Sequence, residues 1–274
     1  MRLKKIALIA AFATMAASAM AGAVHDVGLF TGNTLARNDD GSTGLVNIGF
    51  AANFFSATHT ALFVNNNGNV TFNSSLRTFT PFLLTTNNFP IIAPFFADVD
   101  TTNTTSGITQ YGTNTLGGRN VFGVNWIGVG YFSSQVDKLN SFQLILTDRF
   151  DTGAGNFDIE FNYDQILWET GSASGGVNGF GGTPAAAGYT DGGANDFEFA
   201  GSRVTRSFLD SNPTGLIHGS RNSNILGQYI FNVRNGVVID PPTNGVPEPE
   251  TLALVGLALA GMAVLRRRKS VKTV

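Results

Sequence analysis

The 274-residue sequence contains no cysteine. Disulfide bonds, zinc-thiolate sites and a cysteine nucleophile are therefore all excluded. The stability of the chain must come from a buried apolar core, and 23 phenylalanines are available to fill one.

Charged residues are also scarce, at 13% of the chain, and the basic ones concentrate at its two ends. Residues 22–246 contain nine basic and seventeen acidic side chains, a net charge of −8, with Lys138 as their one lysine. Nucleic acid is bound by clustered Lys and Arg, so we expect no nucleic-acid partner. Abundant Gly, Asn and Thr favour strands and turns over helices.

The motifs of several catalytic centres are missing as well. The histidines at positions 25, 59 and 218 lack the H-x-x-x-H spacing of a zinc site. No G-x-S-x-G elbow supports Ser-His-Asp catalysis, and no glycine pair follows a strand and opens a helix as a phosphate-binding loop does. These patterns predict no catalytic residues and no cofactor.

Residues 1–21 have the layout of a secretory signal peptide. Basic residues near the start precede an apolar run over 6–17, and small residues follow. The A-x-A arrangement of Ala19 and Ala21 favours cleavage after Ala21, and cleavage two residues earlier or later also fits. We expect export through the inner membrane, the alternative being a retained amphipathic helix.

The other end carries an apolar segment, Thr251 to Leu265, whose fifteen residues include no charge. It is short for a transmembrane helix but admissible, and the arginines after it would lie on the cytoplasmic side. A proline-rich stalk over 239–246 precedes this region and favours an extended backbone.

The C-terminal pattern over 247–269 resembles the PEP-CTERM sorting tail of Gram-negative bacteria with extracellular polysaccharide. Its elements here are Pro247, Glu248 and Pro249, the apolar segment, and Arg266, Arg267 and Arg268. The resemblance implies an exosortase-type enzyme that cuts near the motif and releases the protein or transfers it to the surface. A plain C-terminal membrane anchor is the alternative.

The remaining residues are enough for one large domain. Apolar and polar side chains alternate over 141–147 and 156–163, which is typical of an antiparallel sheet with one solvent-exposed face. We therefore predict a single all-β, antiparallel, β-sandwich-like domain over 22–238. The glycine- and alanine-rich stretch 172–193 is expected to be a flexible loop within it.

Two stretches organise this domain. The run LFVNNNGNVTF (Leu62 to Phe72) predicts a hairpin, because both residues of an Asn-Gly pair can adopt the positive φ of a tight turn between two apolar runs. The run FPIIAPFFADVD (Phe89 to Asp100) predicts a buried central strand that leaves the core at two carboxylates. In the run VFGVNWIGVGYF, Gly123 and Gly128 indicate bulges or close approach of another segment.

These stretches, with FTPF, VNWIGVGYF, DKLNSFQLIL and FDIEFNYDQILWETG, resemble in order the NIDO domain, a nidogen-type extracellular β-domain of matrix and adhesion proteins. The core of the resemblance runs over 48–171. It implies a role in adhesion and transfers no ligand-binding residues.

Asp98 and Asp100 are two residues apart, so in a strand they share a face. With the Thr101 hydroxyl, they are oxygen ligands of the kind that Ca²⁺ prefers, and we predict a calcium site there. In the alternative interpretation these acids cap a turn or pair with Arg119 or Lys138.

Carbohydrate chemistry supplies the rival hypotheses. Four acids, Asp151, Asp158, Glu160 and Asp164, could serve a glycosidase, although alternation places Asp158 and Glu160 on a solvent-exposed face. The aromatic residues Trp126, Tyr131, Phe132 and Trp168 would stack on sugar rings or else fill the core.

Taken together, the sequence predicts a secreted or surface-displayed non-catalytic protein of cell-matrix adhesion or the exopolysaccharide and biofilm matrix. Its expected partners are the exosortase-type enzyme, extracellular polysaccharide or surface proteins, and the membrane before processing. The alternative is a secreted carbohydrate-active enzyme.

Overall fold

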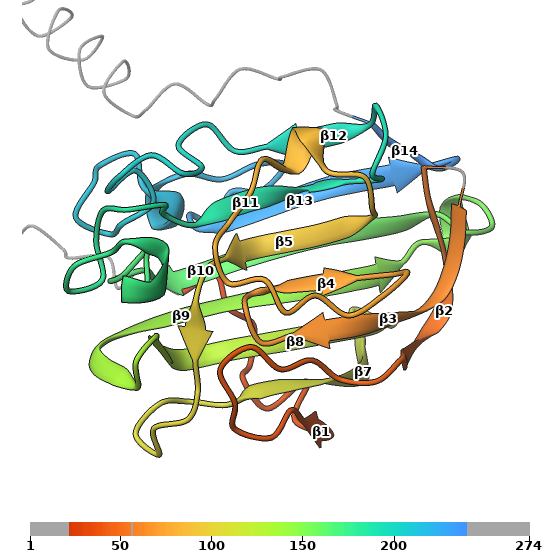
Figure 1. The fold of residues 1–274 in the computed structure, drawn as a ribbon. Helices are drawn as coiled ribbons and strands as arrows, with labels where there is room; N and C mark the ends of the chain where they lie inside the picture. The colour runs from red at the N-terminus through yellow and green to blue at the C-terminus, as the bar shows by residue number, and fades with distance from the viewer. Residues whose placement is uncertain (1–21, 56, 240–274) are drawn as a thin grey trace, which may run out of the picture.

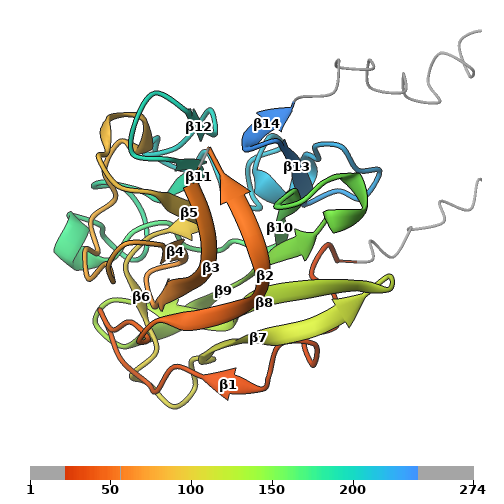
Figure 2. The same ribbon diagram turned by 90° about the vertical axis from the view of Figure 1, so that its right-hand side faces the viewer.

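The computed structural model describes residues 22–55 and 57–239. Within them, two antiparallel β-sheets pack face to face, joined by loops and four short 3-10 helices (Figures 1 and 2). The predicted all-β, sandwich-like fold is confirmed.

The first sheet has the strand order β1-β7-β8-β9-β10-β13-β14, with β6 paired to β8. Its strands are β1 (Asn33–Thr34), β6 (Val99–Asp100), β7 (Thr109–Leu116), β8 (Arg119–Tyr131), β9 (Gln135–Asp148), β10 (Phe157–Gln165), β13 (Gln228–Arg234) and β14 (Val237–Ile239).

The second sheet has the order β12-β11-β5-β4-β3-β2. Its strands are β2 (Val46–Phe54), β3 (Ala57–Asn65), β4 (Asn69–Thr71), β5 (Ile91–Phe96), β11 (Ala186–Thr190) and β12 (Asp196–Glu198). The 3-10 helices are η1 (Leu84–Thr86), η2 (Phe150–Thr152), η3 (Ser172–Ser174) and η4 (Leu216–His218).

The core between the sheets is aromatic. Phe142 of β9 lies 5.2 Å from Phe95 of β5, centroid to centroid, and stacks on Trp126 of β8 at the same distance. Leu144 and Leu146 share its inward face, as the alternation over 141–147 predicts. Aromatic pairs of this kind add stability beyond the area that they bury.

The two organising stretches form as predicted. Asn65 pairs with Asn69 across the turn between β3 and β4, so the hairpin is confirmed. Strand β5 lies inside its sheet between β4 and β11, and all six of its residues are buried. One face of β5 meets the main core, and the other packs under the connection that contains Phe82 and Phe89.

The outer face of β8, β9 and β10 differs from expectation, because the segment before β1 covers it. Phe30 packs against Val121 and Ile145, and its ring occupies the space where a Cβ of Gly123 would lie. Gln143 is fully buried beneath this segment and accepts a hydrogen bond from the His25 amide (3.1 Å). Polar side chains of this face, among them Asn125, Gln143 and Glu160, bond to one another or to the covering segment.

Residues 172–193 also differ from expectation, since they contain β11. This strand pairs with β5 on one side and β12 on the other. Its small residues permit close approach: a Cβ on Gly188 would lie 2.9 Å from the Cα of Glu198. Glycine and alanine here indicate tight packing, and the predicted loop is wrong for this part of the stretch. At Gly128 the register between β8 and β9 shifts, as the glycine pattern predicts.

Candidate functional site

Asp98 stands where the chain leaves β5, and its side chain is buried with 1% of its surface exposed. The backbone is fixed there: the Asp98 carbonyl accepts a hydrogen bond from the Phe132 amide (3.1 Å). Within the described part of the chain, no group donates a hydrogen bond to either carboxylate oxygen. A buried carboxylate without a donor or a cation is unfavourable, so this side chain lacks a partner.

Two further acids from a distant part of the sequence meet Asp98. Asp39 and Asp40 lie in the loop 38–41, which follows β1, and each contributes one carboxylate oxygen within 4.8 Å of the others and of one from Asp98. We call these three residues the acidic cluster. Among the described residues, no ion pair joins any of the three to a basic side chain.

The turn between β3 and β4 holds the loop in place. Asn66 donates its side-chain amide to the backbone oxygens of Asp39 (2.6 Å) and Val99. Asn67 donates to the Asp40 carboxylate (2.8 Å) and accepts from the Val99 amide (3.0 Å). Both asparagines are buried, so the hairpin turn is a rigid support for the acidic cluster.

Burial and mutual repulsion weaken the acidity of the cluster. Burial first, and then the charges of Asp39, Asp40 and Asp100, raise the pKa of Asp98 to about 8. Burial, followed by the charges of Asp100 and Asp40, raises the pKa of Asp39 to about 6. Burial and neighbouring like charges both disfavour the ionised form of these carboxylates.

Asp100 has a different environment from Asp98, although the sequence predicts the two as a pair. Its oxygens accept hydrogen bonds from the amides of Thr102 (2.8 Å) and Ser134 (2.7 Å). This arrangement is the turn-capping alternative. The other alternative, pairing with a base, has no support here, because Arg119 pairs with Asp151 and Lys138 pairs with Asp137. Calcium binding at Asp98 and Asp100 stays a prediction.

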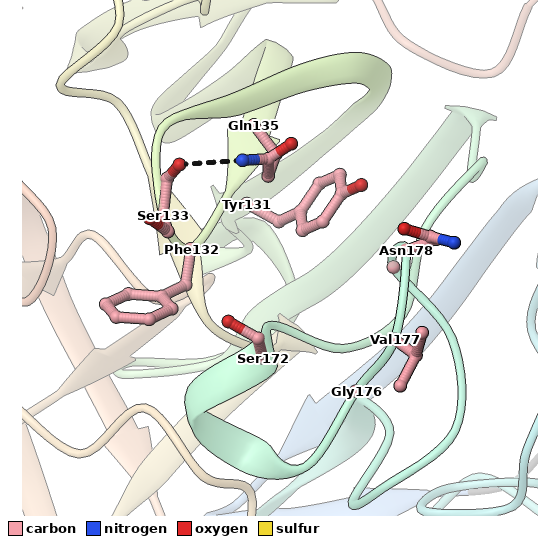
Figure 3. A pocket seen from close by; sticks show the side chains of 9 residues that line it. Tyr131, Phe132, Ser133, Gln135, Ser172, Gly176, Val177 and Asn178 are labelled. Atoms are coloured by element: carbon pink, nitrogen blue, oxygen red, sulfur yellow. Dashed lines mark hydrogen bonds between the residues drawn. The ribbon is translucent and has the colours of Figure 1, made fainter.

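Figure 3 shows the residues that line a pocket of about 310 Å³. Its lining comes from the β8–β9 turn and the stretch 172–179: Tyr131, Phe132, Ser133, Gln135, Ser172, Gly176, Val177, Asn178 and Gly179. Gly171 lies close both to Asp98 of the cluster and to Phe132 of the pocket lining. A Cβ there would lie 2.7 Å from the Cγ of Asp98 and 2.8 Å from the Cβ of Phe132, so only glycine leaves room for this carboxylate.

The aromatic residues singled out in the sequence belong mainly to the core. Trp126 and Trp168 are fully buried, and Tyr131 is nearly so. Phe132 is partly exposed at the pocket. The core interpretation is therefore correct for the two tryptophans, and no exposed aromatic platform joins all four residues.

The acids considered for a glycosidase are held in structural interactions. Asp158 pairs with Arg149 (2.7 Å) and Arg234 (2.6 Å). Glu160 is 8% exposed and accepts hydrogen bonds from His25 and Gln228, each at 2.8 Å. The prediction that these two acids face solvent is wrong, because the N-terminal segment and basic side chains cover them.

The remaining two acids of that set also serve local structure. Asp151 pairs with Arg119 and Arg149, and Asp164 accepts the Val24 amide (2.9 Å). None of the four lies in the pocket lining.

Several predicted features lie outside the described residues: the signal peptide with Ala19 and Ala21, the stalk from residue 240 onward, and the sorting tail. Across 22–55 and 57–239, no helix has the length and apolar character needed to cross a membrane. The predicted transmembrane segment 251–265 is not part of these ranges.

Asp39 and Asp40 were not identified from the sequence as site residues. The motif Asn38-Asp39-Asp40-Gly41 indicates only a polar loop. The available signal was the pair of adjacent acids beside glycine, and nothing in local sequence places them against a residue 58 positions away.

Comparison with known proteins confirms both resemblances. The nidogen-like domain family matches residues 60–235, and the PEP-CTERM protein-sorting motif matches residues 245–269. Alpha-tectorin from Mus musculus is 34% identical over 232 residues, and alpha-tectorin from Gallus gallus is 33% identical over 233 residues. Each alignment covers 74% of this chain and 10% of the relative, so the chain spans about a tenth of the length of these proteins. No solved structure matches the chain.

Proposed function

Because the chain belongs to the nidogen-like domain family and carries a PEP-CTERM sorting motif, we propose that it is a non-catalytic surface protein of cell-matrix adhesion or the exopolysaccharide matrix. The sorting motif implies processing by an exosortase and export to the cell surface. The presence of both features in one chain is the observation that carries the proposal.

The pocket supports binding rather than catalysis. Its nine lining residues include two aromatic rings, amides and hydroxyls, but no Asp, Glu or His that could act as a general acid or base. Contacts of this kind are individually weak. Many copies on one surface would bind a polymer by avidity, without high affinity at any single pocket.

Binding and activity should be measured on protein purified from cells that express the full chain. We expect retention on polysaccharide from the host matrix and no release of reducing ends. The rival hypothesis, a carbohydrate-active enzyme, predicts product formation that Asp98→Asn or Asp100→Asn abolishes. Absence of both retention and surface display would refute the proposal.

Processing of the tail needs a separate experiment. Mass spectrometry of the mature form should find a C-terminus near Pro247, and Glu248→Ala should shift the population toward chains that keep residues 251–274. Recovery of intact tails alone from wild-type cells would favour the membrane anchor instead.

A further inference from the structure

We propose that the acidic cluster, Asp39, Asp40 and Asp98, binds one calcium ion between the loop 38–41 and the end of β5. Calcium binds oxygen ligands at 2.3–2.6 Å, so two ligands of one ion lie no more than about 5 Å apart. The three carboxylate oxygens meet this limit, since all lie within 4.8 Å of one another.

The unpartnered carboxylate of Asp98 is the independent sign of a ligand. It is buried, both of its oxygens lack a hydrogen-bond donor among the described residues, and it points into the cluster. One oxygen of Asp39 is likewise buried and unbonded. Buried polar atoms normally have partners, so two orphaned carboxylates side by side indicate a missing cation.

The surrounding charges reinforce this conclusion. The charged groups that act on Asp98 are Asp39, Asp40 and Asp100, all of them acidic. Three carboxylates give the cluster a charge near −3 when ionised, which a divalent cation reduces to near −1.

The site is pre-organised by the asparagine turn rather than by the acids themselves. Asn66 and Asn67 fix the backbone of Asp39 and the side chain of Asp40, and the Asn38 carbonyl accepts the Thr101 amide (2.9 Å). The loop is therefore held before any ion binds. Pre-organisation lowers the free-energy cost of gathering like charges.

The ligand chemistry selects calcium among the common cations. The cluster contains carboxylate oxygens and no thiolate or imidazole, which disfavours zinc. Magnesium keeps several waters in a strict octahedron, whereas calcium accepts irregular sets of carboxylate and backbone oxygens. Extracellular calcium-binding modules have Kd values of roughly 10⁻⁴–10⁻³ M, and we expect a Kd in this range for the acidic cluster.

Calorimetry and thermal unfolding of the purified full chain, first stripped with EGTA, test the proposal. We expect one calcium ion per chain and a rise in Tm of roughly 5–10 °C when calcium is about 100-fold above Kd. Asp98→Asn should abolish the calcium-dependent rise. In EGTA its Tm should equal or exceed that of the wild type, because an uncompensated buried carboxylate is removed.

Asp40→Asn provides a second variant on the partly exposed side of the cluster, and it should weaken calcium binding about tenfold or more. Asp26→Asn is the matched control: it removes one exposed acid outside the cluster, and Asn can still accept the Gly28 amide. The proposal is overturned if the wild type shows neither heat nor a Tm shift, or if Asp98→Asn or Asp40→Asn retains the full response. An equal response to magnesium would overturn the assignment to calcium.

Discussion

The hairpin turn that supports the acidic cluster provides the sharpest test of how this fold is built. Gly68 has a φ of +70°, and its carbonyl accepts a hydrogen bond from the Phe95 amide (3.2 Å). A Cβ at this position would lie 2.8 Å from the carbonyl carbon of Phe95 and closer still to its oxygen. Because the obstacle is backbone inside the central strand, no side-chain rotation can relieve the overlap.

The expected loss for Gly68→Ala follows from these contacts. A left-handed backbone costs alanine about 1 kcal/mol relative to glycine. Moving the turn away also breaks the bonds from Phe95 to Gly68 and from Ala97 to Asn67, each contributing about 1 kcal/mol. We therefore expect a loss of roughly 3–4 kcal/mol, or about 10 °C in Tm for a domain of this size.

Gly118→Ala is the matched control for this substitution. Its φ of +76° is close to that of Gly68, but nothing lies within 4 Å of its Cβ position. Urea unfolding followed by circular dichroism should place Gly118→Ala about 1 kcal/mol below wild type and Gly68→Ala about 2 kcal/mol lower again. Equal losses in the two variants would refute the argument that β5 and the turn are locked together.

Three further substitutions probe the same framework. Asn67→Ala removes the bond that the Val99 amide donates to the Asn67 side chain, leaves that amide its other acceptor, the Ala97 carbonyl (2.9 Å), and removes the donor to the Asp40 carboxylate. The unfolding free energy should fall by roughly 2–4 kcal/mol and calcium affinity should drop, and unchanged calorimetry would contradict this. Trp126→Phe removes the donor to the Asn66 carbonyl (3.0 Å), so the unfolding free energy measured in urea should fall by roughly 2–3 kcal/mol. An unchanged unfolding free energy would show that this hydrogen bond does not stabilise the fold. The hydrogen bond to Glu160 raises the pKa of His25, although burial opposes this effect. The stability that this bond contributes is therefore fully present below the pKa of His25 in the unfolded chain, and it is lost as the pH rises through the pKa of His25 in the folded chain. His25→Gln should therefore be more destabilising at pH 5.5 than at pH 8.5, and equal losses at both pH values would contradict the assignment.

The elements predicted well from sequence are those with a local cause. The Asn-Gly pair marks the β3–β4 turn, in which Gly68 of the pair has a positive φ and Asn67 does not. Continuous apolar residues place β5 in the interior. Gly128 marks a real shift of register between β8 and β9. In each case the residues that carry the signal are neighbours in the chain.

The failures have a non-local cause. Alternation over β10 correctly separates Phe157, Ile159 and Phe161 from Asp158 and Glu160, but it cannot reveal that a segment more than a hundred residues earlier covers the polar face. For β11, glycine and alanine report the space available beside β5 and β12, which depends on strands elsewhere. Amino-acid composition indicates the secondary-structure propensity of a segment, whereas its burial depends on which other segments of the chain pack against it.

The acidic cluster combines one residue that local sequence predicts with two that only contacts between distant segments place there. Sequence reasoning selects Asp98 because β5 ends there, and it pairs Asp98 with Asp100 because the two lie close in the chain. The structure instead satisfies Asp100 with the amides of Thr102 and Ser134 and leaves Asp98 beside Asp39 and Asp40. The buried asparagines of the hairpin turn hold these two acids in place. The turn residues thus have a second role that turn propensity does not specify. Asp or Gly at position 67 would still suit a turn, but neither supplies the amide that donates to Asp40 while accepting from Val99.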